Sequence, residues 1–356
     1  MFFFAEYTQK ESNPWWQVIG GIKGFNHNCC TVFTASHVCC MDEMMSAFRP
    51  QTTATGNLPN ISYIQRKPEP LGSELKCVAC GQTGVMIYLE LQQGKDGMRN
   101  AKFVDKMIKT AACTARLIKY SSLSPVHDVD DLSCEVVVGG KKVESRRSPT
   151  YLGDAYFGSI PAVVAAVGLG ANMICVVKNA YTAYPKKFFE EEMKDWPPGL
   201  NLVATATVDG VEMVAIGYKY SQRKVLSFLM NKGAGSVCDG NLYVAKWKDG
   251  HNNTISRFVP CPQAVATYFK DANKVDSHNQ SRQADLHLEK CWISRCGFFR
   301  LATTLFSTCV VGEWKTYRHH TSSRHHHHNI DLMDFVSILA KDLLQNSLTR
   351  RINVPA

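Results

Sequence analysis

The chain has 356 residues, of which 45% are hydrophobic and 20% are charged. This composition is typical of a globular protein with a buried core, and it excludes disorder, collagen and coiled coil as descriptions of the whole chain. The length predicts about two domains, or one large domain with an insertion. Lysine and arginine number 40 against 31 acidic residues, a net charge of +9, which is compatible with a polyanionic partner such as nucleic acid.

The sequence also indicates where the protein does not reside. Residues 1–10 have no basic region and only a short apolar run, so no secretory signal is predicted. The 14 cysteines lack the regular spacing of a small secreted scaffold, which indicates reduced thiols in a cytosolic or nuclear protein. Residues 155–177 carry no charge and have the length of a membrane span, but their glycines, proline and asparagine predict a buried helix and strand instead, with no membrane association.

The first half of the chain alternates between predicted strands and helices. Residues 75–79 and 85–91 are predicted to be strands joined by a turn at residues 81–84. Apolar residues at helical spacing predict a helix over residues 107–118. The polar stretch 121–149 predicts a surface excursion. A short apolar strand is then expected to end at Asp154, followed by a helix and a second strand.

The second half predicts a β-rich block and then helices. Short β-rich runs separated by Asp-Gly and glycine-rich turns predict an antiparallel insertion over residues 201–260. Helical patterns follow. They cover residues 263–271, 276–292, 298–314 and, after a histidine-rich stretch, 332–344. The expected fold class is therefore α/β, with an inserted antiparallel β block and C-terminal helices.

Two aspartates are candidate site residues. Asp154 is expected at the carboxyl end of a strand, where open α/β sheets place ligand and metal sites, although a turn or helix N-cap aspartate has the same sequence context. Asp276 begins a predicted helix with a polar stripe that includes Asn279 and His287. That stripe predicts either a site lining or a solvated face capped by Asp276.

Metal-binding cysteine motifs are not predicted. Cys77 and Cys80 form a single C-x-x-C without a second ligand pair at a familiar spacing, so we expect no zinc. The histidines at 325–328 are interpreted as low-complexity surface sequence.

Four segments, in order, resemble piggyBac-type transposases and the host proteins derived from them. Residues 41–49 are similar to the family's "[IM]-D-E-x-M-x-x-F-[KR]" segment, and Tyr63 to Gly72 to "Y-[IM]-x-x-K-P-x-x-x-G". Residues 153–161 are similar to "D-x-[WFY]-F-[TG]-S-[LIV]-P". Residues 262–299 contain the counterpart of "P-x-x-[IV]-x-x-Y", "V-D-x-x-D-Q", a tryptophan and "F-F". Residues 58–72 also resemble the copies found in oomycete genomes.

The resemblance implies an RNase H-like fold with a mixed sheet, in which three aspartates hold two divalent metal ions for DNA cleavage and joining. It divides the chain into a short N-terminal segment that is expected to be truncated, a core in two parts around the β block, and a histidine-rich linker with a terminal helix. The boundaries of these five parts are 1–36, 37–200, 201–260, 261–318 and 319–356.

The resemblance carries Asp154 to the family's second acid and Asp276 to its third, and makes both metal ligands. The first acid is expected in a "C-D-x-x-T-G" context, where this chain has Gly81, and the position of an additional acid is held by Asn279. Loss of a carboxylate weakens Mg²⁺ binding, because this ion prefers hard oxygen ligands. The chain is thus predicted to be a catalytically degenerate DNA-binding protein in which Mg²⁺ binding is weak or lost.

Alternative functions stay open at this point. A substitute acid would make the chain an active Mg²⁺-dependent transposase, and the candidates are Glu74, Glu90, Asp42 and Glu43. The remaining alternatives are a non-catalytic protein-interaction domain and a genomic remnant.

Double-stranded DNA is the expected partner, a homodimer is possible, and the nucleus is the expected location, with the cytoplasm as the alternative. Basic side chains are the candidate contacts to DNA phosphates. They are Lys141, Lys142, Arg146, Arg147, Lys186, Lys187, Arg295, Arg300 and Arg318.

Overall fold

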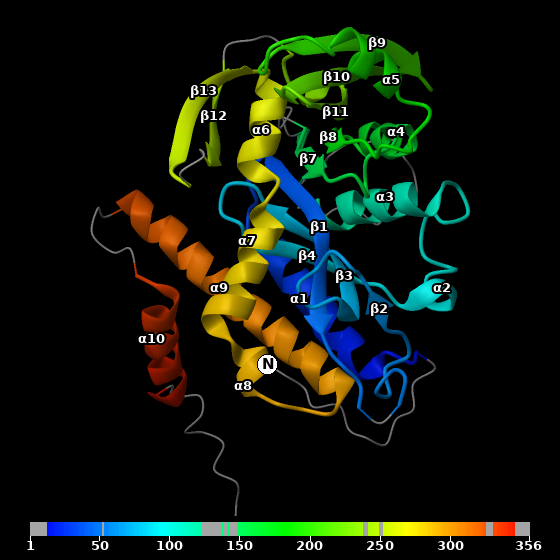
Figure 1. The fold of residues 1–356 in the computed structure, drawn as a ribbon. Helices are drawn as coiled ribbons and strands as arrows, with labels where there is room; N and C mark the ends of the chain where they lie inside the picture. Colours follow the sequence, from blue (N-terminus) through cyan, green and yellow to red (C-terminus); the bar gives the residue numbers. More distant parts are fainter. Residues whose placement is uncertain are drawn as a thin grey trace, which may run out of the picture.

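A nine-stranded mixed sheet with helices on both faces forms the centre of the protein (Figure 1). The computed structural model describes residues 13–51, 53–122, 137–138, 141–142, 148–237, 241–248, 252–324 and 330–345. Strand order across the sheet is β2-β3-β1-β7-β8-β11-β10-β9, and β4 also pairs with β3.

Strand β1 (Val38–Ala47) lies between an antiparallel and a parallel part of this sheet. On one side it pairs antiparallel with β3 (Leu71–Cys80), which also pairs with β2 (Ser62–Tyr63) and β4 (Met86–Leu91). On its other side β1 pairs parallel with β7 (Thr150–Gly153), and β7 pairs parallel with β8 (Asn172–Val176). Carboxyl ends of parallel strands meet at one edge, so residues beyond β7 are brought next to the middle of β1.

The β-rich block at 201–260 continues the main sheet, where the sequence predicts a separate insertion. Strand β11 (Lys224–Asn231) pairs antiparallel with β8, and β10 (Val211–Ser221) and β9 (Asn201–Val208) follow. Strands β12 (Asn241–Lys248) and β13 (Thr254–Cys261) of this block pair as a ribbon of their own. The difference has a physical reason: alternation in the sequence predicts strands but not their neighbours, and the free edge of β8 offers unpaired backbone groups to β11.

Helices cover the two faces of the sheet in separate groups. One face is covered by α1 (Trp16–Val32), α6 (Gln263–Asp271), α7 (Lys274–Gln280) and α9 (Gly297–Arg324). The other face is covered by α3 (Lys109–Ser121), α4 (Ile160–Gly168) and α5 (Lys186–Glu192). Alternate residues of β1 enter the two cores, as the pleat requires: Cys40 and Met44 pack on the first face, and Cys39 and Met41 on the second.

Smaller elements complete the described chain. They are α2 (Gly94–Gly97), the ribbon β5 (Val137–Val138) and β6 (Lys141–Lys142), a 3-10 turn (Lys232–Ala234), a π-helical turn (Ser281–Leu286), α8 (Leu288–Cys291) and α10 (Leu332–Gln345).

Most predicted elements are found within a few residues of their expected bounds, including the 75–91 hairpin and the helix over 263–271. The uncharged residues 155–177 contain α4 and β8, and within the described ranges no helix has both the length and the apolar character that crossing a bilayer requires. Helix α1 and strand β1 are not predicted from the sequence. The helix expected over 276–292 is interrupted, because the chain widens into the π-helical turn and His287 adopts a left-handed backbone (φ 56°).

Candidate metal centre

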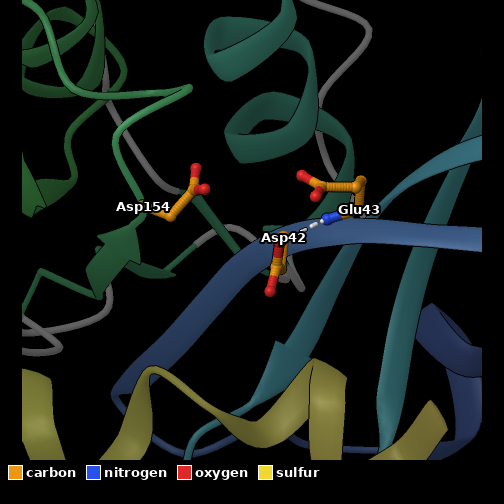
Figure 2. Close-up of side chains that lie close together, drawn as sticks. All are labelled: Asp42, Glu43 and Asp154. Atoms are coloured by element: carbon orange, nitrogen blue, oxygen red, sulfur yellow. Dashed lines mark hydrogen bonds between the residues drawn. The ribbon is translucent and has the colours of Figure 1, made fainter. Parts of the chain in front are cut away.

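Two adjacent acids lie in the middle of β1, on the buried central strand of the sheet. Asp42 is 8% exposed and Glu43 is 1% exposed. Neighbouring residues on a strand point to opposite faces, and Figure 2 shows the two side chains leaving β1 in opposite directions. Asp42 lies on the side of α7, whereas Glu43 lies on the side of its cross-strand partner Lys76 on β3.

Asp154 is brought to these acids by the parallel pairing of β7 with β1. Met41 is in register with Gly153, so the next residue along each strand is Asp42 and Asp154. Carboxylate oxygens of Asp42, Glu43 and Asp154 all lie within 4.8 Å of one another (Figure 2). The Tyr156 N–H donates to Asp154 Oδ1 at 2.8 Å, which fixes the carboxylate at the beginning of its loop, as a turn aspartate would be.

The loop after Asp154 depends on glycine at position 158. A Cβ on Gly158 would lie 1.8 Å from the carbonyl oxygen of Val176 on β8. The loop therefore passes so close to the backbone of β8 that a larger residue has no space. This close approach explains why a glycine lies between Phe157 and Ser159 in the segment that follows Asp154.

Asp276 reaches the same region from the first turn of α7. Its helix is preceded by Asn273 at the N-cap position, so Asp276 is not the cap that the sequence allows as an alternative. Asp276 Oδ1 lies 3.2 Å from Lys67 Nζ, which in turn lies 3.6 Å from Glu43 Oε1. The Asp276 side chain is 62% exposed, so the group of acids opens to solvent on this side.

The electrostatics of the two β1 acids differ. Burial, with the charges of Glu43 and Asp276, raises the pKa of Asp42 to about 7. Burial also acts on Glu43, but Lys76, Lys67 and Arg66 outweigh it and lower the pKa of that carboxyl. Asp42 is therefore a buried acid with unfavourable like charges, whereas Glu43 is a buried anion with several cations.

Gly81, the position that the resemblance gives to the missing first acid, lies outside this cluster. Gly81 is in the turn after β3, and its N–H donates to Val38 O at 2.8 Å, at the beginning of β1. Four residues of strand, about 13 Å, separate Val38 from Asp42. The neighbour of Asp154 is Asp42, and the glycine replaces no carboxylate there.

Glu74 and Glu90, the other acids considered as substitutes, each form an ion pair with a basic side chain. Glu74 pairs with Lys76 at 2.7 Å, and Glu90 forms a two-pronged pair with Arg116 at 2.6 and 2.9 Å. One signal in the sequence distinguishes Asp42: it is the aspartate of the "[IM]-D-E" segment, inside an otherwise apolar run that forms a buried strand. Asn279 follows Asp276 by one turn of α7, and its Oδ1 is buried without a hydrogen-bond partner among the described residues.

The predicted basic residues whose side chains the structure describes lie on different elements. Lys186 lies on α5 near Glu190 at 3.4 Å, and Lys187 beside it is exposed. Arg295 is exposed between α8 and α9, and Arg300 is partly buried on α9. Arg318 lies over the Trp314 ring at 4.9 Å. The side chains of Lys141 and Lys142 and all of Arg146 and Arg147 fall outside the described residues.

The donor set fits a hard divalent cation. Asp42, Glu43 and Asp154 offer only carboxylate oxygens, which Mg²⁺ and Mn²⁺ prefer. Asp276 offers another carboxylate, which shares Lys67 with Glu43. Burial, and then the charges of Glu43 and Asp276, raise the pKa of Asp42. A divalent ion between these carboxylates would offset their mutual repulsion.

Comparisons with known proteins agree with this architecture. A family model described as Transposase IS4 matches residues 4–125. The structure is also similar to a piggyBac transposase seen by cryo-EM in a synaptic complex with hairpin DNA, with a TM-score of 0.64 and 16% sequence identity. The match covers 98% of this chain and 60% of that transposase chain, so this chain spans about three fifths of its length. No curated protein matches. The RNase H-like fold and the resemblance to piggyBac-type transposases predicted from the sequence are thus confirmed.

Proposed function

We propose that the chain is a divalent-metal-dependent DNA strand transferase of the piggyBac type, with Asp42, Asp154 and Asp276 as its acids. The observation that carries the proposal is the proximity of Asp42, on β1, to Asp154, which directly follows the adjacent parallel strand β7. Asp276 lies on α7, which packs against β1. This function replaces catalytic degeneracy, which depended on Gly81 holding the place of the first acid.

The three acids of this proposal are positioned in different ways. These carboxylates would hold two divalent ions, which when bound would supply activation of water or a 3′-hydroxyl and stabilisation of the leaving oxygen. Asp42 is fixed by the central strand and Asp154 by the turn that ends at Tyr156, so their oxygens need little reorganisation. Asp276 contributes its carboxylate from α7, on the side of the site that opens to solvent. Asn279 Oδ1, which has no hydrogen-bond partner in the described part of the chain, supplies a neutral oxygen one turn further along α7.

Mg²⁺- or Mn²⁺-dependent nicking of supercoiled plasmid tests the proposal. Asp42→Asn, Asp154→Asn and Asp276→Asn are each expected to reduce nicking at least 100-fold, because each removes a ligand charge. Glu212→Gln, at an exposed acid paired with Lys232, is the matched control and should leave nicking unchanged.

Other outcomes would favour other functions. Full activity of Asp42→Asn would contradict the assignment of Asp42. A wild-type chain that binds DNA but never cleaves it would favour the degenerate DNA-binding protein. Absence of both metal and DNA binding would favour an interaction domain or a remnant.

DNA binding by exposed basic residues is a second part of the proposal. Lys187, Arg295 and Arg318 are exposed, and each of them that neutralises a phosphate should contribute about 0.9 to the slope of log affinity against log salt. Fluorescence anisotropy with a labelled duplex, compared between the wild-type chain and a triple alanine variant, measures that slope. An unchanged slope would remove these residues from the interface.

The proposed activity also implies a location and an assembly. Action on chromosomal DNA requires entry into the nucleus, which a fluorescent fusion tests. The similar transposase is described in a synaptic complex, and light scattering of this chain with and without duplex DNA tests whether it pairs.

A further inference from the structure

Glu43 differs from the three proposed ligands in its surroundings. It is 1% exposed, and three cations lie around it. Arg66 Nη2 contacts Glu43 Oε1, Lys67 Nζ lies 3.6 Å from the same oxygen, and Lys76 Nζ lies 3.8 Å from Oε2. A carboxylate with this many positive neighbours is already compensated, and a divalent ion placed beside it would meet three like charges.

Two of these cations each extend from Glu43 to one proposed metal ligand. Arg66 Nη2 lies 3.4 Å from Asp154 Oδ2, and Lys67 Nζ lies 3.2 Å from Asp276 Oδ1. Glu43 Oε1 is the atom that both cations share. A metal ion that binds Asp154 and Asp276 therefore competes with Arg66 and Lys67 for these carboxylates.

The segment that carries both cations is held in a defined shape. Residues 64–70 join β2 to β3, and the Ile64 N–H donates to Pro70 O at 2.8 Å while the Lys67 N–H donates to Ile64 O at 3.0 Å. The Arg66 side chain is 58% exposed, so its guanidinium has access to solvent from its position over the acids. A planar guanidinium with free donors matches a phosphate as well as a carboxylate.

We propose that Glu43 is not a metal ligand but the anchor of a cationic clamp, Arg66 and Lys67, which competes with metal ions for Asp154 and Asp276 and passes to a DNA phosphate when the metal binds. This inference rests on the proposed metal centre and adds a coupling to it. The clamp makes metal binding weak without DNA, since the ion must overcome two positive charges. A phosphate at the site relieves that opposition because it gives the displaced cations a new partner.

Mn²⁺ binding to metal-stripped full-length chain, measured by electron paramagnetic resonance, tests the clamp without any need for activity. The double variant Arg66→Ala/Lys67→Met is expected to bind Mn²⁺ at least tenfold more tightly than the wild-type chain. Lys232→Ala, at an exposed lysine paired with Glu212, is the control and should match wild type. A short DNA duplex is expected to tighten Mn²⁺ binding by the wild-type chain and to have little effect on the double variant.

The role of Glu43 is tested in the same background. Adding Glu43→Gln to the double variant should leave Mn²⁺ affinity unchanged if Glu43 is only an anchor, and a tenfold loss would show that it is a ligand. Equal affinity of the wild-type chain and the double variant would overturn the clamp and leave the metal centre standing. Failure of every variant to bind Mn²⁺ would overturn the metal centre and, with it, the clamp.

Discussion

The Asp42→Asn substitution distinguishes the effect of the acid cluster on the free energy of unfolding from its role in metal binding. Asp42 is 8% exposed, and burial with the charges of Glu43 and Asp276 raises its pKa from 3.8 to about 7. A carboxyl whose pKa is raised by folding contributes most stability below its unfolded pKa and loses it as the pH rises through the folded pKa. The wild-type chain is therefore expected to lose stability through Asp42 between about pH 4 and pH 7.

The size of the effect follows from the shift. About three pKa units at 1.36 kcal/mol each give a cost on the order of 4 kcal/mol above pH 8 and about 2 kcal/mol at pH 5. Asparagine has no charge to bury, and its Oδ1 can still accept the Glu43 N–H that now donates to Asp42 Oδ1 at 2.7 Å. Without metal, Asp42→Asn should thus stabilise the protein, and more so at pH 8.5 than at pH 5.

Urea unfolding in EDTA at the two pH values measures this difference, and a second series with Mn²⁺ tests its functional meaning. A ligand at 100 times its Kd adds about 2.7 kcal/mol of stability, and the wild-type chain should gain this while Asp42→Asn gains little. A variant that is destabilised equally at both pH values, or that gains as much from Mn²⁺ as the wild-type chain, would refute the reasoning.

Four further substitutions test packing and burial outside the proposed metal centre. Gly81→Ala should cost about 1–3 kcal/mol of stability, because its Cβ would lie 2.8 Å from Val38 O. Gly20→Ala on α1, where the new Cβ has open space around it, should instead stabilise the protein by about 0.4–1 kcal/mol. The urea unfolding midpoints of the two variants check both values, and equal effects would contradict the geometry of the turn at Gly81. Lys219→Met should cost about 1–3 kcal/mol in thermal unfolding, since the buried Lys219 Nζ donates to two carbonyls at the end of α5 at 2.6 and 2.8 Å; no loss would show that water replaces it. Burial lowers the pKa of His278 from 6.5 to about 3. The contribution of neutral His278 to stability is therefore present above pH 6.5 and is lost as the pH falls toward 3, with about 2 kcal/mol lost by pH 5. His278→Gln should reduce the loss of stability between pH 6.5 and pH 3, and an unchanged loss would contradict this.

The order and type of the secondary-structure elements could largely be predicted from the sequence. Alternating residues and Asp-Gly turns mark β9 to β13, and apolar residues at helical spacing mark α3, α6 and α10. These signals are local, because burial of one face at a fixed period leaves its pattern in the chain itself. The four family-like segments likewise indicated the RNase H-like fold without any knowledge of the tertiary structure.

Strand β1 is the clearest element that local pattern missed. Its sequence, Val-Cys-Cys-Met-Asp-Glu-Met-Met, contains two acids and several good helix formers. Neither the two-residue alternation of a strand nor the 3.6-residue period of a helix therefore appears. It is a strand because both of its edges are paired and both of its faces are covered. Tertiary burial decides this conformation, and the residues themselves do not.

Tertiary structure also decides the composition of the site. The sequence singled out Asp154 and Asp276, since each begins or follows a recognisable element, and it assigned the first acid to a turn 39 positions beyond Asp42. Only the parallel register of β1 with β7 shows that Asp42 is the neighbour of Asp154, and only the positions of Arg66 and Lys67 show which acids share their cations. The types of the candidate residues could be predicted from the sequence, because metal binding requires carboxylate side chains. Their proximity depends on strand pairing between segments more than 100 residues apart.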